Sequence, residues 1–426
     1  MSDMRQAWVG IIALAWAAAA HAADSPSAGI AGFEFGGQVR PEAIDSQAAQ
    51  RGPLALAASL SPGIVELPAS GAALLTELRA SGHGLSGTAT FEQQRLEGQA
   101  MHSSAWVNEL YASGEAAGWQ FSAGKRIVAW DVGYGFRPND FVAQEARRTL
   151  LANTSEGRPV LSAEHFDAST AWSFVIVNPT KPRSQRGAEE PAFAVRVYQR
   201  DGAVDWHGFA RVGARTGASI GAASAWVASD AVELHASLRY LNAADTIAID
   251  PAALNGSPTG LVRSNPWAEA SVRHVVQALV GGTWTNADQL SLLAEAWWDG
   301  TALSNTQWDD WNARNRQLGA LIGTPAPTNA VAGNLAWQGS AFGAASNLRR
   351  ANLFMRLSWT YDKWQPAFDV LYTPADAGRI VTASLGWQGD RVRIDGGFRL
   401  YGGPDGAVLA QLPTRRIAYL AGTWAF

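Results

Sequence analysis

The sequence predicts an all-β protein, a closed antiparallel barrel of about 18 strands that crosses a membrane, with 16 strands as the alternative. Three observations predict this fold class. Apolar and polar residues alternate along most of the chain, the links between alternating segments are short on one side and mostly long on the other, and the chain ends in an apolar, aromatic strand. The 426 residues are 47% apolar and only 16% charged, which argues against a disordered chain.

Alternation marks the predicted strands. In the segment 391–401, four apolar residues fall on one face and four charged residues on the other, which is the two-residue period of a half-polar strand. The segments 204–212 and 231–240 repeat this pattern. A soluble β-sandwich would alternate in the same way, so alternation alone leaves both water and lipid open as the outer medium.

The lengths of the links favour lipid. Strands are expected near 33–42, 72–81, 85–97, 104–113, 118–130, 160–166, 170–178, 190–200, 204–212, 217–228, 230–242, 266–283, 287–300, 346–361, 365–373, 378–388, 390–401 and 414–426. One side has tight links rich in Gly, Asn and Asp, at 81–84, 113–115, 201–202, 229–230, 286–288, 362–363 and 389–390. The other side has mostly long links, at 43–71, 131–159, 179–189, 243–265, 301–345 and 402–413. Short turns opposite long loops are typical of a bacterial outer-membrane barrel, whose short turns face the periplasm. The count of 18 depends on the hairpin 160–178; without it, 16 strands remain.

The last strand supports the same interpretation. Counting back from Phe426 in steps of two gives Trp424, Gly422, Leu420 and Ala418, all apolar or small. This strand resembles the C-terminal strand of outer-membrane barrels, which typically ends in Phe and is bound by the barrel-assembly machinery. Many of the 19 Trp residues lie near predicted strand ends, as in the aromatic girdles of such barrels. The alternative is a Trp-rich, carbohydrate-binding β-protein of the periplasm.

The N-terminus carries the pattern of a secretory signal peptide, expected at residues 1–22. Arg5 precedes an uncharged run that ends in an Ala-His-Ala cleavage pattern, with cleavage near Ala22. This run is shorter than the roughly 20 apolar residues that cross a bilayer as a helix. The mature chain, 23–426, is therefore expected in the outer membrane of a Gram-negative cell.

One long link is expected to contain a helix. In 301–345, Trp308, Trp311 and Asn315 share one face of a short amphipathic helix, and the remainder is predicted to be turn-rich loop. The helix is expected either outside the cell or folded into the barrel mouth.

The composition also excludes several function classes. Lys and Arg number 33 against 37 Asp and Glu, and this charge of −4 argues against nucleic-acid binding. The absence of Cys excludes disulfides, thiolate metal sites and a Cys nucleophile. No metal-binding or nucleotide-binding motif is found, so no metal, cofactor, catalytic residue or enzyme activity is expected. An outer-membrane hydrolase stays as an alternative because Asp205 and His207, like Glu233 and His235, share one predicted face.

The polar faces of the strands are expected to line a lumen. The inward charged positions are Glu77, Arg79, Glu92, Glu109, Arg126, Arg196, Arg200, Asp205, Arg211, Glu233, Arg239, Arg273, Glu295, Arg356, Asp369, Arg391, Arg393, Arg399 and Arg415. Opposed rows of arginine and carboxylate create an electric field across a pore. Polar solutes can exchange part of their hydration shell for contacts with these side chains. Alternatively, these side chains only pair with one another and brace the lumen, although 16 or more strands enclose more space than side chains fill.

One loop carries a more specific pattern. The segment 124–130 reads G-K-R-x-x-x-W, Pro138-Asn139-Asp140 comes next, and E-G-x-P-x-L begins at Glu156. These elements resemble porin-like outer-membrane proteins of the alginate-export type, and the resemblance implies a barrel channel related to carbohydrate export. The loop 131–159 also contains four arginines and is a possible constriction loop that gives mild anion preference; they are Arg137, Arg147, Arg148 and Arg158. Alternatively, the loop points outward and its arginines bind lipopolysaccharide phosphates.

The expected function is passive or facilitated passage of small polar or anionic solutes through an outer-membrane channel. The solutes considered include carbohydrate-related molecules. The expected partners are outer-membrane lipid and lipopolysaccharide, the barrel-assembly machinery and the solutes themselves. A structural or adhesive barrel without transport is the competing class.

Overall fold

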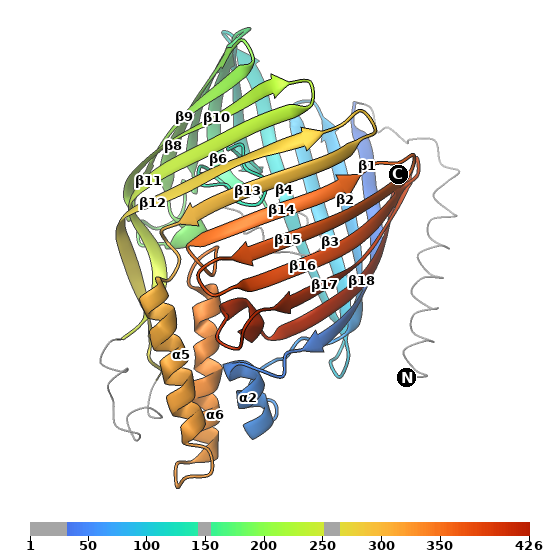
Figure 1. Cartoon of the computed structure of the whole chain (residues 1–426). Helices are drawn as coiled ribbons and strands as arrows, with labels where there is room; N and C mark the ends of the chain where they lie inside the picture. Colours follow the sequence, from blue (N-terminus) through green and yellow to red (C-terminus); the bar gives the residue numbers. More distant parts are fainter. Residues whose placement is uncertain (1–31, 144–154, 251–264) are drawn as a thin grey trace.

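The computed structural model describes residues 32–143, 155–250 and 265–426, and within these residues eighteen strands form one antiparallel sheet. Each strand pairs with its neighbours along the chain, and β1 (Glu34–Ala48) pairs with β18 (Thr414–Ala425), so the sheet closes on itself (Figure 1). The predicted fold class and the count of 18 are confirmed, including the hairpin of β6 (Arg158–Phe166) and β7 (Thr170–Val177). The expected signal peptide lies outside the described residues.

The other strands match the predicted segments, with shifts at their ends. They are β2 (Gly71–Gly82), β3 (Leu85–Leu96), β4 (His102–Ala116), β5 (Trp119–Arg126), β8 (Ala192–Asp201), β9 (Val204–Gly213), β10 (Gly217–Ser229), β11 (Val232–Ile249), β12 (Trp267–Thr285), β13 (Leu290–Asp299), β14 (Ala351–Trp359), β15 (Trp364–Thr373), β16 (Gly378–Gln388) and β17 (Val392–Gly402). β11 extends seven residues beyond its predicted end at 242, so the predicted long link 243–265 is shorter than expected.

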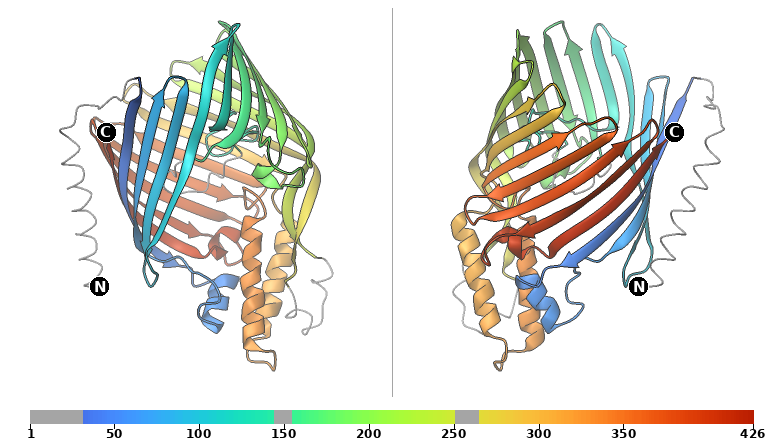
Figure 2. Two further views of the ribbon diagram at one scale, coloured as in Figure 1. Left: turned by 180° about the vertical axis from the view of Figure 1, so that it is seen from behind. Right: turned by 45° about the vertical axis from the view of Figure 1, so that its right-hand side comes forward.

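The two ends of the barrel differ as predicted. β1 begins and β18 ends at the end with the tight turns, and the long connections lie at the opposite end (Figure 2). One predicted turn was wrong: residues 113–115 lie inside β4, and the chain reverses at Ala117 and Gly118. Both turn residues have positive φ, 52° and 78°, as the tightest hairpins require.

Burial separates the two faces of the wall. Large apolar side chains such as Ile220, Leu238, Val280 and Leu420 point outward and are more than half exposed. The residues that alternate with such outward positions along the strands, for example Arg239 and Glu77, point into the barrel and are buried. A wall that shows Leu, Ile, Val and Trp to its surroundings and keeps its charges inside is the arrangement that a lipid environment requires.

Helices occupy the end with the long connections and project away from the barrel (Figures 1 and 2). They are α2 (Pro53–Leu60), α5 (Asn305–Ala320) and α6 (Thr328–Trp337), with the 3-10 turns η1 (Gly187–Glu189), η2 (Gln338–Gly343) and η3 (Val408–Gln411). None of the helices in the described part of the chain is both long and apolar enough to cross a membrane.

The predicted amphipathic helix in this region is confirmed as α5. Ser304 and Gln307 form its capping box, and Trp308 and Trp311 are buried. The expectation that the remainder of the link is loop was wrong, because the stretch up to Trp337 forms α6, which packs on α2. α6 carries no charged residue. The apolar residues of α6 do not repeat clearly with the helical period, because the helix is buried through contacts with α2 and α5 rather than against the barrel.

Candidate functional site: a lumen crossed by one loop

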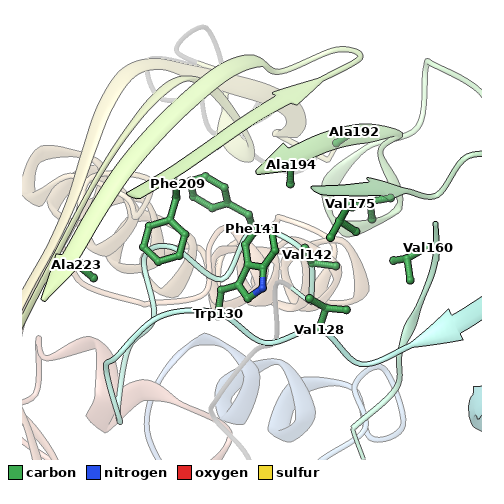
Figure 3. Close-up of a cluster of buried hydrophobic side chains, with 11 residues drawn as sticks. Val128, Trp130, Phe141, Val142, Val160, Val175, Ala192, Ala194, Phe209 and Ala223 are labelled. Carbon is green, nitrogen blue, oxygen red and sulfur yellow. The ribbon is translucent and has the colours of Figure 1, made fainter. Parts of the chain in front are cut away.

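The segment 127–143, here called the inward loop, leaves the end of β5 and folds into the barrel. Val128, Trp130, Phe141 and Val142 are buried against the inner face of β6 to β10 (Figure 3). The wall is apolar there, with Val160, Val175, Val177, Ala192, Ala194, Phe209 and Ala223 on the lumen side. The inner face therefore carries an apolar patch on one side, and this patch holds the loop inside the lumen.

The tip of the inward loop reaches the opposite wall. Phe136 packs against Leu279 and Trp297, with ring centroids of Phe136 and Trp297 6.0 Å apart. The ring of Tyr134 stacks on Phe354 at 5.9 Å. The loop thus starts at the end of β5, contacts the inner face of β6 to β10 and reaches β12 to β14, so it crosses the lumen from β5 to β14.

Polar contacts fix the middle of the loop. Asp131 accepts hydrogen bonds from the backbone N–H of Asn139 (2.6 Å) and from the hydroxyl of Ser237 (2.9 Å). Burial raises the pKa of the Asp131 carboxyl, although these hydrogen bonds act in the opposite direction. The buried Arg239 donates to the carbonyl of Pro138 (2.9 Å), and its guanidinium lies 4.2 Å from the centre of the Phe141 ring.

A polar cavity of about 980 Å³ lies beside the loop, along the wall that runs from β14 through β18 to β4. Its charged lining residues are Arg40, Arg79, Arg356, Arg393, Arg399, Glu77, Glu109, Asp369 and Asp395. Most form ion pairs, such as Arg393 with Asp395 and Arg356 with Asp369. Arg399 donates to Thr382 (2.9 Å) and has no carboxylate within 4.0 Å among the residues that the structure describes.

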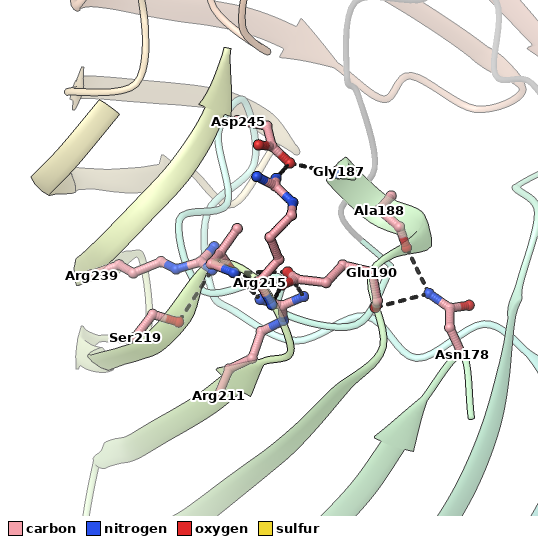
Figure 4. Close-up of polar contacts among 10 residues, drawn as sticks. Asn178, Gly187, Ala188, Glu190, Arg211, Arg215, Ser219, Arg239 and Asp245 are labelled. Atoms are coloured by element: carbon pink, nitrogen blue, oxygen red, sulfur yellow. Dashed lines mark hydrogen bonds and ion pairs between the residues drawn. The ribbon is translucent and has the colours of Figure 1, made fainter. Parts of the chain in front are cut away.

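A second cavity, of about 570 Å³, lies on the side of the loop that faces the long connections. At its edge Glu190 is buried, accepts backbone hydrogen bonds from Arg215 and Thr216, and pairs with Arg211 at 3.0 Å (Figure 4). Burial alone would raise the pKa of Glu190, but these hydrogen bonds and the charge of Arg211 together lower it. Arg215 also pairs with Asp245, which ties this corner to β11.

The structure separates the predicted pore residues into four groups. Glu77, Arg79, Glu109, Arg356, Arg393 and Arg399 line the large cavity. Glu92, Arg126, Arg196, Asp205 and Glu233 lie on the inner face outside that cavity, and Arg211 and Arg239 are buried beside the second cavity. Arg200, Arg391 and Arg415 lie at exposed positions near strand ends.

The predicted constriction-loop arginines are not all placed. Arg147 and Arg148 lie outside the described residues. Arg137 is part of the inward loop and donates to the carbonyl of Gly133 (2.8 Å). The placement of Arg158 in the loop was wrong, because it is the first residue of β6 and pairs with Glu189 (2.6 Å).

Sequence reasoning missed several residues of the site. Tyr134 and Phe136 carry the loop tip, and Asp395 and Arg40 line the cavity. Nothing in the local sequence separates Tyr134, Phe136 and Arg40 from ordinary loop or strand residues. Alternation already assigns Asp395 to the face of Arg393, so that residue was recoverable. The contacts of the loop tip depend on partners more than 140 residues away and have no local signal.

The residues proposed for a hydrolase are engaged in other contacts. His235 bonds to Glu295 (3.0 Å), and His207 is bonded by Arg196 (3.3 Å) and stacks on Phe209. Asp205 accepts from the hydroxyl of Tyr198. In the ranges that the structure describes, no group of three or more His, Asp or Glu side chains is arranged to hold a metal ion.

The closed barrel, the tight turns at one end, the long connections at the other and the loop across the lumen define the class: a porin-like β-barrel. Among solved structures, the chain is similar to a mutant of the Rh. blastica porin (9% identity, TM-score 0.41) and to a triple mutant of the Rhodopseudomonas blastica porin (11%, 0.43). A structure described as "Asymmetric conductivity of engineered proteins" is similar to the same degree (11%, 0.43). Each likeness covers 92% of this chain and 100% of the other. These superpositions are loose, so the architecture rests on the strand pairing of this chain. No family model and no curated protein matches the sequence.

Proposed function

We propose that this protein is an outer-membrane channel for passive or facilitated passage of small polar solutes. The observation that carries the proposal is the arrangement of the lumen. The inward loop fills one side through apolar contacts, while the wall from β14 to β4 keeps a cavity of about 980 Å³ lined by charged and polar side chains. A barrel that served only as a scaffold or an adhesin would gain nothing from keeping this side open and polar.

The charges of the cavity suit solutes that are polar without requiring one sign. Five arginines and four carboxylates line it, and most are paired. Such side chains can replace hydration around a polar solute as it passes. Mild anion preference remains part of the proposal, since Arg399 forms no ion pair with a carboxylate among the described residues. Arg147 and Arg148 would add further positive charge if they lie in the lumen.

Conductance measurements test the channel. Purified, refolded protein is expected to give discrete conductance steps in planar bilayers and to swell liposomes in sugars, amino acids and organic acids. A folded barrel, shown by heat modifiability on a gel, that conducts nothing would favour the structural or adhesive alternative. Recovery in the soluble periplasmic fraction would contradict the outer-membrane location.

Ion preference has its own test. Replacing Arg147 and Arg148 by Ala is expected to reduce the anion preference measured as reversal potential in a salt gradient. An unchanged preference would mean that these two residues lie away from the pore, where lipopolysaccharide phosphate is the alternative partner. Carbohydrate relatedness, which the resemblance to alginate-export proteins suggests, is tested by comparing swelling rates in neutral sugars and uronic acids of equal size.

A further inference from the structure

We infer that Glu295 is the residue that positions the tip of the inward loop and thereby sets the aperture of the channel. The inference rests on the proposed channel function for its consequence, but its structural basis is independent. Glu295 lies on the inner face of β13, and its side chain is fully buried.

Both carboxylate oxygens of Glu295 bind the backbone of the loop tip. The N–H of Tyr134 donates to Oε1 at 2.6 Å, and the N–H of Gly135 donates to Oε2 at 2.6 Å. Hydrogen bonds from backbone N–H groups to a buried carboxylate are short and strong because the acceptor is charged. This one side chain therefore holds two successive residues of the loop against the wall.

The Glu295 carboxylate also contacts a histidine of the barrel wall. His235 on β11 contacts Oε1 through Nε2 at 3.0 Å, and its Nδ1 lies 3.5 Å from Glu233. β12 runs between β11 and β13. Its residue Gly281 pairs with His235 on one side and with Glu295 on the other. A Cβ at Gly281 would lie 2.6 Å from both His235 Nε2 and Glu295 Cγ, so the missing side chain is what lets the two meet across the strand.

A second glycine permits the approach of the loop. A Cβ at Gly135 would lie 3.0 Å from Glu295 Oε2 and 3.2 Å from the Trp297 ring. Two glycines, one on the wall and one on the loop, thus leave room for the same carboxylate. The contact is built from four separate parts of the chain and is not an incidental approach of a loop to a wall.

The position of the tip matters for passage because the tip carries Tyr134 into the lumen. Tyr134 is 46% exposed, and its hydroxyl accepts from Arg356 (3.2 Å), which lines the large cavity. Release of the tip would withdraw Tyr134 from Arg356 and widen the space beside the β14 to β15 wall. Glu295 is accordingly a positioning residue that acts through Tyr134, with His235 as its support.

Hydrogen exchange tests the positioning directly, without reference to transport. In Glu295→Ala, the amides of Tyr134 and Gly135 are expected to exchange at least about tenfold faster, because each loses a bond to a charged acceptor. Glu295→Gln keeps the size of the side chain but turns an NH₂ group toward a backbone N–H, so it is expected to lose protection as well. Glu164→Ala is the matched control, since this inner-face carboxylate contacts Arg126 and Ser173 of the wall rather than the loop.

Transport then tests the consequence. Glu295→Ala and Glu295→Gln are expected to admit larger sugars in liposome swelling and to give larger, noisier single-channel steps, whereas Glu164→Ala keeps the size limit of the wild type. Gly281→Ala keeps the Glu295 side chain but places a Cβ against both Glu295 Cγ and His235 Nε2, so it is expected to displace the carboxylate and to shift the size limit in the same direction. Unchanged amide exchange in both Glu295 variants would overturn the positioning role, and faster exchange with an unchanged size limit would overturn the role in the aperture. Failure of the proposed function is distinguishable, because the wild-type protein itself would then not conduct.

Discussion

Phe141→Ala should undock the inward loop from the β6 to β10 wall. Phe141 is fully buried, its ring lies 5.9 Å from that of Phe209, and it covers the guanidinium of Arg239 at 4.2 Å. Truncating a buried Phe to Ala costs about 3–5 kcal/mol through lost transfer energy and the cavity left behind. Because the substitution removes contacts of the loop and leaves the strand pairing intact, we expect this cost to fall on the docking of the loop.

The expected effect can be measured as local opening. When opening is fast relative to cleavage, the rate of proteolysis tracks the population of the open state, so 3 kcal/mol corresponds to a rate increase of about 150-fold. Thermolysin digestion of the refolded barrel, with cleavage sites mapped by mass spectrometry, should therefore show new cuts within 127–143. Phe141→Leu, which keeps an apolar side chain, should raise the rate by roughly tenfold, as for a cost near 1.4 kcal/mol.

Two results would refute this reasoning. If Phe141→Ala left cleavage within 127–143 at the wild-type rate, the apolar patch would not be what holds the loop. If cleavage increased equally in the strands and in the loop, the substitution would have destabilised the barrel as a whole, and the loop could not be treated as a separately docked element.

Three further predictions concern other parts of the chain. Trp311→Ala, at a fully buried side chain of α5, should cost about 3–5 kcal/mol of local stability and increase proteolysis within 303–343, while wild-type resistance there would contradict the packing seen. The pKa of Glu190 is lowered on folding, so its contribution to stability is present above pH 4.5 and is lost as the pH falls through the lowered pKa. Amide exchange at residues 215–216 should therefore become faster in that acidic range. Glu190→Gln should remove this pH dependence. Deleting Phe426, which exchanges backbone hydrogen bonds with Gly37, should lower the yield of assembled barrel in the outer membrane, and normal assembly would argue against a role for this residue in recognition by the assembly machinery.

The sequence by itself determined the architecture to a large extent. A strand with one face in lipid and the other in a polar lumen must alternate with period two, so segments such as 391–401 reveal both their conformation and the direction of their side chains. Glycine-rich and aspartate-rich turns mark the tight end for the same local reason. The predicted count of 18 strands, with 16 as the alternative, and the inner faces of Glu77, Arg356 and Arg393 come from these short-range patterns.

The tertiary structure alone decided what occupies the lumen. The sequence offers a long loop with scattered aromatic residues and arginines, and either an inward or an outward course satisfies its local preferences. The inward course depends on Val160, Val175 and Ala194, which lie on the inner faces of separate strands and form an apolar patch only when the barrel closes. The same holds for Glu295, whose partners at Tyr134 and His235 are 161 and 60 residues away in the chain. Such contacts join residues by the closure of the sheet, and no periodicity along the sequence records them.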